Sequence, residues 1–89
     1  MRTEWYPDFF GDAEELNEDI KDFIGHVCLI HYRFFKPGLF YVDRLWYSMG
    51  VIHVKRYSDF RQTMKIHKIH SIKRISDVEE MLFKLEYDL

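Results

Sequence analysis

Hydrophobic residues recur at helical spacing near both ends of the chain. An acidic segment over residues 12–24 carries an apolar stripe every three or four residues, which predicts an amphipathic helix that begins after Asp12 and stops at Gly25. This stripe consists of Leu16, Ile20, Phe23 and Ile24. A shorter segment over residues 77–87 follows Ser76, a good N-cap residue, and predicts a second helix. Its stripe consists of Val78, Leu82 and Leu85, with Met81 alongside.

Between these helices the pattern changes to alternation. Many β-branched and aromatic residues, alternating with polar ones, occur over residues 26–75, which predicts antiparallel strands. The predicted strands cover residues 26–35, 39–47, 51–57, 61–67 and 70–75. A turn is supplied by Pro37 and Gly38, but the join between the last two strands has no Gly, Pro, Asn or Asp. We therefore expect a 3₁₀ turn around residues 67–69, which is typical of small SH3-type and Sm-type barrels.

These elements predict one domain over residues 1–89 that is mainly β with flanking helices (α+β). Its expected architecture is a small five-stranded SH3/Sm-like antiparallel barrel over residues 26–75, with an N-terminal and a short C-terminal helix. A chain this short builds only a modest core, so both helices are expected to pack on the barrel. The residues expected to be buried in this way are Leu16, Ile20, Phe23, Leu82 and Leu85. If the C-terminal segment does not pack, its stripe of Met81, Leu82, Phe83 and Leu85 is better interpreted as a partner-binding helix.

Composition adds an excess of rings and a lack of cysteines. Aromatic residues make up 18% of the chain, so some rings are expected at the surface, where apolar patches usually mark a partner site. Cys28 is the only cysteine, and we interpret it as a small buried strand residue. The absence of disulfides, of an apolar secretion signal in MRTEWYPDFF and of a long apolar run predicts a cytoplasmic protein that does not enter a membrane.

Charge is segregated along the chain, although the net charge is only −2. Residues 1–24 carry two basic and eight acidic residues, residues 25–76 carry ten basic and two acidic residues, and residues 77–89 carry one basic and five acidic residues. This arrangement leaves two interpretations open. Either the acidic ends fold back and neutralise the basic sheet, or the basic face is open and meets phosphate or an acidic partner.

The sequence offers little for catalysis or for binding a cofactor. The five histidines stand at spacings that match no zinc motif, and the four glycines form no phosphate-binding loop. Cys28 and His31 stand three positions apart on one predicted strand, so their side chains point to opposite faces of the sheet. We therefore expect no metal ion, no cofactor and no enzymatic activity.

The candidate site is a basic stretch with interleaved rings. This combination suits single-stranded nucleic acid, because rings stack on bases and cations contact phosphates, although strands also alternate charge and rings for packing reasons alone. The residues expected to bind nucleic acid or an acidic partner are Lys55, Arg56, Arg61, Lys65, Lys73 and Arg74, from a cluster that includes Lys68. The expected partner-binding aromatic residues are Trp46, Tyr57 and Phe60.

Three short motifs resemble those of one protein family. They comprise Glu15, Leu16, Asn17 and Ile20 in the predicted first helix, Ile30 and Tyr32 in the first strand, and Met64, Ile66, Ile69 and Ile72 near the end of the barrel. Over about residues 12–75 the chain resembles the YolD-like family of small bacterial and phage proteins. The resemblance implies an SH3- or Sm-type barrel and an accessory role beside Y-family DNA polymerases in damage-tolerant synthesis. The chain departs from the family pattern in its Lys-Pro-Gly turn and in lacking a glycine in the second strand.

The expected function is that of a non-catalytic adaptor or regulatory protein that binds a protein partner. The aromatic excess and the resemblance motivate this expectation, and the resemblance suggests a translesion DNA polymerase as the partner. Another nucleic-acid enzyme, modulated by a phage-encoded protein, fits the same reasoning. The alternative is direct binding of single-stranded nucleic acid through the basic face of the sheet. Assembly into a homo-oligomer also remains open.

Overall fold

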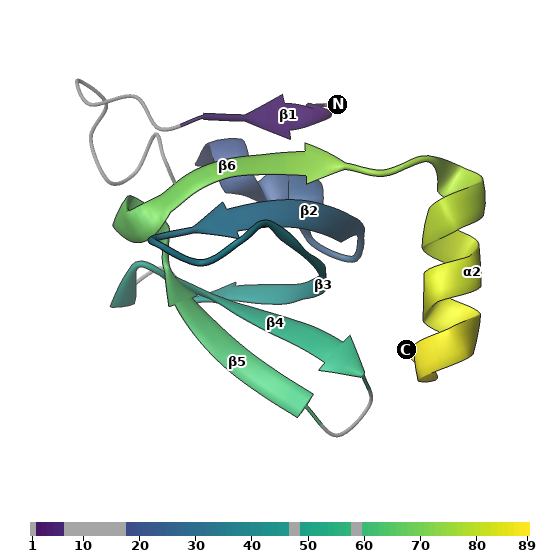
Figure 1. The fold of residues 1–89 in the computed structure, drawn as a ribbon. Helices are drawn as coiled ribbons and strands as arrows, with labels where there is room; N and C mark the ends of the chain where they lie inside the picture. Colours follow the sequence, from purple (N-terminus) through teal and green to yellow (C-terminus); the bar gives the residue numbers. More distant parts are fainter. Residues whose placement is uncertain (1, 7–17, 47–48, 58–59) are drawn as a thin grey trace.

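The fold is a curved antiparallel sheet of six strands, followed by a helix at the C-terminal end (Figure 1). It is seen in a computed structural model that describes residues 2–6, 18–46, 49–57 and 60–89, without the side chains of Tyr57 and Phe60. The elements are β1 (Glu4–Trp5), η1 (Lys21–Phe23), β2 (Val27–Tyr32), β3 (Gly38–Trp46), β4 (Val51–Tyr57), β5 (Phe60–Lys65), η3 (Ile66–Lys68), β6 (Ile69–Arg74) and α2 (Asp77–Tyr87).

The strands follow the order β1-β6-β2-β3-β4-β5, and every neighbouring pair is antiparallel. The mainly β character and the C-terminal helix that the sequence predicts are confirmed. The predicted number of five strands is wrong, because β1 adds a sixth strand at the outer edge of β6. The edge strands β1 and β5 are not paired with each other, so the described sheet is not a closed barrel.

Local backbone chemistry explains the strand ends. The first predicted strand was extended to residue 35, but β2 ends at Tyr32, because Arg33 has a left-handed φ of 51° and the chain turns there. The amide of Phe35 donates to the carbonyl of Tyr32 and closes this turn. The 3₁₀ turn predicted between the last two strands is confirmed as η3, one residue earlier than expected.

The core draws side chains from all six strands, from η3 and from the helical residues 18–23. It consists of Trp5, Ile20, Phe23, Cys28, Ile30, Val42, Ile52, Val54, Met64, Ile66, Ile69 and Ile72. Burial of Ile20 and Phe23 confirms that the end of the predicted first helix packs on the sheet. Residues 18–20 are α-helical and lead into η1, and Gly25 follows with a φ of 84°; positions 12–17, with Asp12 and Leu16, lie outside the described residues.

The N-terminal strand contributes a large core residue that the sequence pattern does not reveal. Trp5 stands opposite Ile72 of β6 and is 1% exposed. The amide of Arg74 donates to the carbonyl of Thr3 and extends the pairing. Arg2 adds an ion pair of 2.9 Å with Asp19, which ties this edge strand to the helical turn that packs below it.

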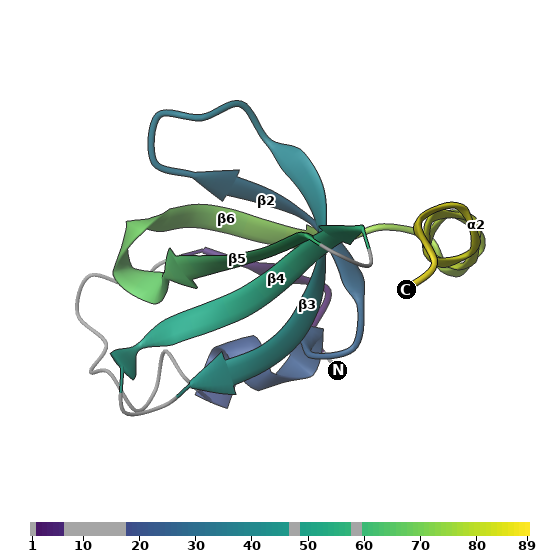
Figure 2. The same cartoon turned by 90° about the horizontal axis from the view of Figure 1, so that it is seen from below.

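The C-terminal helix α2 begins as predicted but packs differently. The hydroxyl of Ser76 accepts a hydrogen bond from the amide of Glu79, which confirms the N-cap. The predicted burial of Leu82 and Leu85 is wrong, because these side chains are 57% and 74% exposed. Figures 1 and 2 show that α2 stands at one end of the sheet and does not lie across it.

This orientation predicts that truncating the outward side of α2 has little effect on folding. The Leu85→Ala variant is expected to change the free energy of unfolding by less than about 0.5 kcal/mol, because its side chain leaves no cavity and alanine is the best helix former. Urea denaturation measures this change. A loss of about 2 kcal/mol or more is typical of a buried leucine and would contradict the exposed position.

Candidate functional site

Helix α2 is attached to the sheet through polar groups. The side chain of Glu80, which is 8% exposed, accepts a hydrogen bond from the backbone amide of Val27 in β2. Its carboxylate also lies 3.2 Å from Nδ1 of His26 and 3.9 Å from Nη2 of Arg74. One turn later, Nζ of Lys84 donates to the carbonyl of Gly25 at 3.1 Å. A buried, hydrogen-bonded carboxylate therefore fixes the side of α2 that faces the sheet.

The environment of Glu80 favours its charged form. Burial on its own would raise the pKa of this carboxyl. The hydrogen bonds from Val27 and His26 and the positive charge of Lys84 act in the opposite direction and outweigh burial, so the pKa of Glu80 is lowered from its ordinary value. The carboxylate is therefore charged at neutral pH and holds α2 in place.

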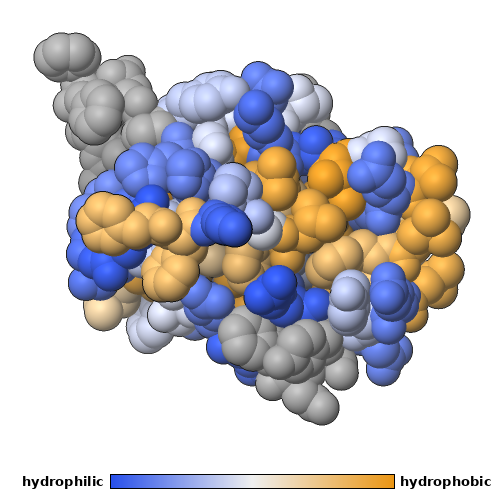
Figure 3. Space-filling model, viewed as in Figure 1, coloured by the Kyte–Doolittle hydropathy of each residue, from blue (hydrophilic) through white to orange (hydrophobic). Residues whose placement is uncertain are grey.

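The opposite side of α2 is apolar and open to solvent. It consists of Val78, Met81, Leu82 and Leu85, each more than half exposed, and we call it the α2 outer face. These positions follow the spacing i, i+3, i+4 and i+7, so they form one stripe. Figure 3 shows hydrophobic atoms along the side of α2 that faces away from the sheet. A hollow of about 350 Å³ beside the stripe is lined by Met81, Leu85, Asp77 and Asp88, among others.

A second surface lies on the outward side of the three strands β3, β4 and β5, which Figure 2 shows side by side. Cross-strand partners share a face, and the register places Tyr41, Lys55 and Arg61 in one row. The next rows are Arg44, His53 and Thr63, and then Trp46, Val51 and Lys65. We call these nine residues the β3–β5 outer face. It contains a ring and at least one cation at each end.

The structure brings together part of the residue set chosen from the sequence. Lys55, Arg61, Lys65 and Trp46 all lie on the β3–β5 outer face. Arg56 lies apart, with its guanidinium 5.7 Å from the ring of Phe40, in a groove of about 390 Å³. The side chains of Tyr57 and Phe60 lie outside the described residues.

The remaining two predicted cations belong to β6. Lys73 is exposed beside the ring of Tyr6, at 5.9 Å from its centroid. The side chain of Arg74 is 14% exposed and contacts Asp77 at 3.4 Å and Glu80 at 3.9 Å. Arg74, one of the ten basic residues over positions 25–76, thus pairs with the acidic C-terminal segment. The described cations of the β3–β5 outer face form no ion pair with described residues.

Several residues that matter for the two surfaces and their surroundings were not singled out from the sequence. Glu80 was not singled out among the carboxylates of the second predicted helix, because nothing in the sequence pattern marks it as the buried one. His53 alternates with the inward Ile52 and Val54 of β4, and this alternation was a usable signal for its face. Arg44 reaches the same face only through the bulge in β3. His31 and His70, on paired strands, have ring centroids 5.0 Å apart. Among the described residues no group of three or more His, Cys, Asp or Glu is placed to hold a metal ion.

Cys28 is held in an unreactive form. Burial, with a smaller contribution from the charge of Glu80, raises the pKa of its thiol to about 12, against the opposing charge of Arg74. We expect a thiol reagent such as Ellman's reagent to modify the native protein at pH 8 at least about a thousandfold more slowly than the urea-unfolded chain, because only the thiolate reacts. Equal rates in the two states would show that the thiol is open to solvent.

Comparisons with family models, with curated proteins and with solved structures find no match to this chain. In the described part of the chain, no helix has both the length and the apolar character needed to cross a membrane.

Proposed function

We propose that this chain is a small non-catalytic adaptor that binds a protein partner through the α2 outer face. The observation that carries the proposal is the orientation of α2, which turns the Glu80 side to the sheet and four apolar side chains to solvent. Contact between water and such an apolar stripe is unfavourable, so a partner that covers the stripe lowers the free energy. An amphipathic helix presented in this way suits binding in a groove of another protein.

The charges around the stripe specify the chemistry of the partner. The exposed acidic residues of the helix are Asp77, Glu79, Glu86 and Asp88, counting its C-cap. Two α2 outer faces packed on each other would bring like charges together, which disfavours a second copy of the chain as the occupant. We therefore propose that the partner offers an apolar groove with a basic rim. Such rims are common on enzymes that handle nucleic acid.

The resemblance to the YolD-like family narrows the proposed partner further. It supports a bacterial DNA polymerase of damage-tolerant synthesis, or another nucleic-acid enzyme of the host, as the protein that α2 contacts. The strand order β6-β2-β3-β4-β5 and the η3 turn between β5 and β6 support the accompanying proposal that the sheet is of the SH3/Sm type.

The proposal is tested by affinity capture and site-specific cross-linking from a bacterial lysate. The wild-type chain, Leu82→Glu/Leu85→Glu and Phe34→Glu serve as baits. A fourth bait, otherwise identical to wild type, carries a photo-cross-linking residue at position 82. Phe34, in the β2–β3 turn, is fully exposed, so its variant is a control that removes an apolar side chain and adds a charge away from α2. We expect one stoichiometric partner to bind the wild-type and Phe34→Glu chains, to cross-link at position 82 and to be lost with the double variant.

The outcomes separate this proposal from its rivals. A partner that survives the double variant, or that is lost only with Phe34→Glu, places binding elsewhere and overturns the proposal. Self-association of the purified chain through position 82 would show a homo-oligomer instead. A chain that recovers no partner and stays monodisperse would leave the α2 outer face without an occupant, and it would also overturn the proposal.

A further inference from the structure

The β3–β5 outer face combines rings and cations on a regular sheet surface. Trp46 is 52% exposed, and its ring lies nearly parallel to that of His53, with centroids 5.9 Å apart and an angle of 25° between the planes. Arg44 stands opposite His53 in the register, so its side chain leaves the strand on the same face as the two rings. A hollow of about 290 Å³ at this point is lined by Arg44, Leu45, Trp46 and His53.

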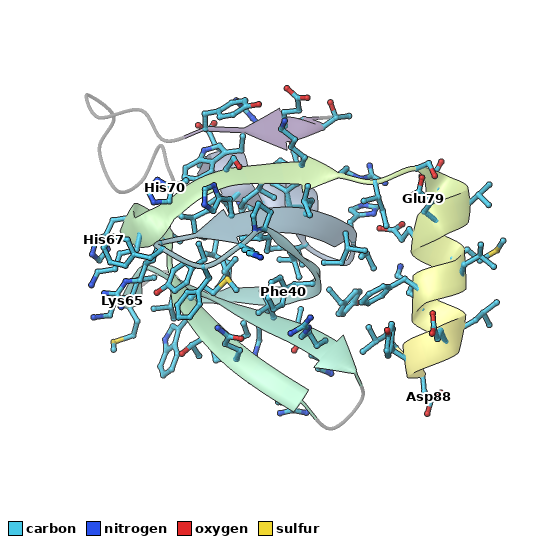
Figure 4. The ribbon with its side chains drawn as sticks, viewed as in Figure 1. Phe40, Lys65, His67, His70, Glu79 and Asp88 are labelled. Atoms are coloured by element: carbon cyan, nitrogen blue, oxygen red, sulfur yellow. The ribbon has the colours of Figure 1, made fainter. Side chains whose placement is uncertain are left out.

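Further cations of the β3–β5 outer face lie on the neighbouring strands β4 and β5. Lys65 stands in the same row as Trp46, across Val51, and Figure 4 marks it at the end of β5 next to η3. Lys55 and Arg61 are direct cross-strand partners further along the same two strands. Arg61 and Lys65 stand four residues apart on one face of β5, with Thr63 between them, so they lie about 13 Å apart along the strand, which is about twice the spacing of successive phosphates in an extended single strand.

Little negative charge opposes these cations. The only acidic residue of the described parts of the three strands is Asp43, the extra residue at the bulge in β3. The acidic groups of the C-terminal segment that form ion pairs with described residues contact Arg74 and His26 instead and, within α2, Lys84. In the part of the chain that the structure describes, no acidic side chain forms an ion pair with Lys55, Arg61 or Lys65.

From this arrangement we propose that the β3–β5 outer face binds single-stranded nucleic acid. A base stacks on the exposed ring of Trp46, and the cations of β4 and β5 contact the phosphates that follow. A single strand fits better than a duplex, because stacking on Trp46 needs an unpaired base and a broad sheet face does not enter a groove. This surface is distinct from the α2 outer face, so the proposal stands without the proposed adaptor function.

The test measures fluorescence anisotropy of labelled oligo-dT and oligo-U of about 12 nucleotides, a length that covers one small binding domain. We expect both strands to bind at low salt, with log K falling against log salt at a slope of about −3 if about four phosphates are neutralised. The Trp46→Ala variant should weaken binding about tenfold and leave the slope unchanged, because stacking carries no charge. The Arg61→Glu/Lys65→Glu variant should weaken binding and flatten the slope.

A matched control separates a defined site from general attraction to polyanions. The Lys21→Glu/Lys36→Glu variant makes the same change of charge at exposed positions off the β3–β5 outer face, and we expect its affinity to stay within about threefold of wild type. Circular dichroism and thermal melting show that each variant is folded. No binding at low salt overturns the proposal, and so does an equal loss with the control, an unchanged affinity of Trp46→Ala, or equally tight binding of duplex DNA.

Discussion

Replacing Trp5 with alanine is expected to lower the free energy of unfolding by about 3–5 kcal/mol. The indole is the largest of the fully buried side chains, and it joins β1 to the centre of the core beside Ile72. Truncation removes its transfer free energy and leaves a cavity that a two-residue edge strand cannot close. A loss of this size is a large share of the stability of a domain of 89 residues.

Urea denaturation followed by circular dichroism measures the change, and two further variants keep the result informative. Tyr6→Ala, next to Trp5 but 55% exposed, is the matched control and should change stability by less than about 1 kcal/mol. Trp5→Phe keeps part of the buried area and loses an indole N–H that has no hydrogen-bond partner among described groups. It should therefore be more stable than Trp5→Ala. If all three variants match wild type, β1 does not contribute to the core.

The residues around Trp5 explain why β1 was not predicted. A strand of two residues has no period to detect, and Pro7 follows it closely. Long alternating segments could be predicted, because burial of one face fixes the register of the strand. Residues 51–57 were predicted as a strand and form β4, with Ile52 and Val54 fully buried and His53 and Lys55 only partly buried.

The C-terminal helix shows a different limit of sequence reasoning. Its bounds, 77–87, were predicted correctly, because caps and helix formers act locally. The orientation of this helix was predicted wrongly: the hydrophobic stripe was expected to face the sheet, but it faces solvent. A carboxylate with a backbone donor and cations around it is stable when buried, and the pattern of apolar residues carries no information about such a tertiary contact.

The candidate site could be predicted only in part for a related reason. Lys55, Arg61 and Lys65 were chosen as part of a basic cluster, and the register places these three on one face of β4 and β5. The sequence could not show that Arg74 forms ion pairs with Glu80 and Asp77, because the position of α2 relative to β6 is not determined by the local pattern. The grouping of Trp46 with His53 and Arg44 depends on the bulge in β3, which shifts the register between Val42 and Arg44.

Replacing Glu80 with alanine is expected to release α2 from β2. The change leaves the amide of Val27 without its acceptor and removes the partner of Arg74 and His26, and breaking a buried ion pair from one side costs about 3–5 kcal/mol. We expect the Val27 amide to exchange its hydrogen about 100-fold faster or more, as measured by NMR. Glu79→Ala is the matched control, because it removes an exposed carboxylate from the same turn, and it should leave this rate within about threefold of wild type.

The same carboxylate makes the attachment of α2 dependent on pH. Because the pKa of Glu80 is lower in the folded protein than in the unfolded chain, its contribution to stability is fully present above the unfolded value of about 4.3. The contribution is then lost as the pH falls through the lower pKa of the folded state. The stability difference between wild type and Glu80→Gln, which keeps an acceptor for Val27 without the charge, should therefore be constant above about pH 6 and shrink below about pH 4. The groups that face this carboxylate are His26, Arg74 and Lys84. A difference that stays flat down to pH 2 would show that the charge of Glu80 does not hold α2 to the sheet.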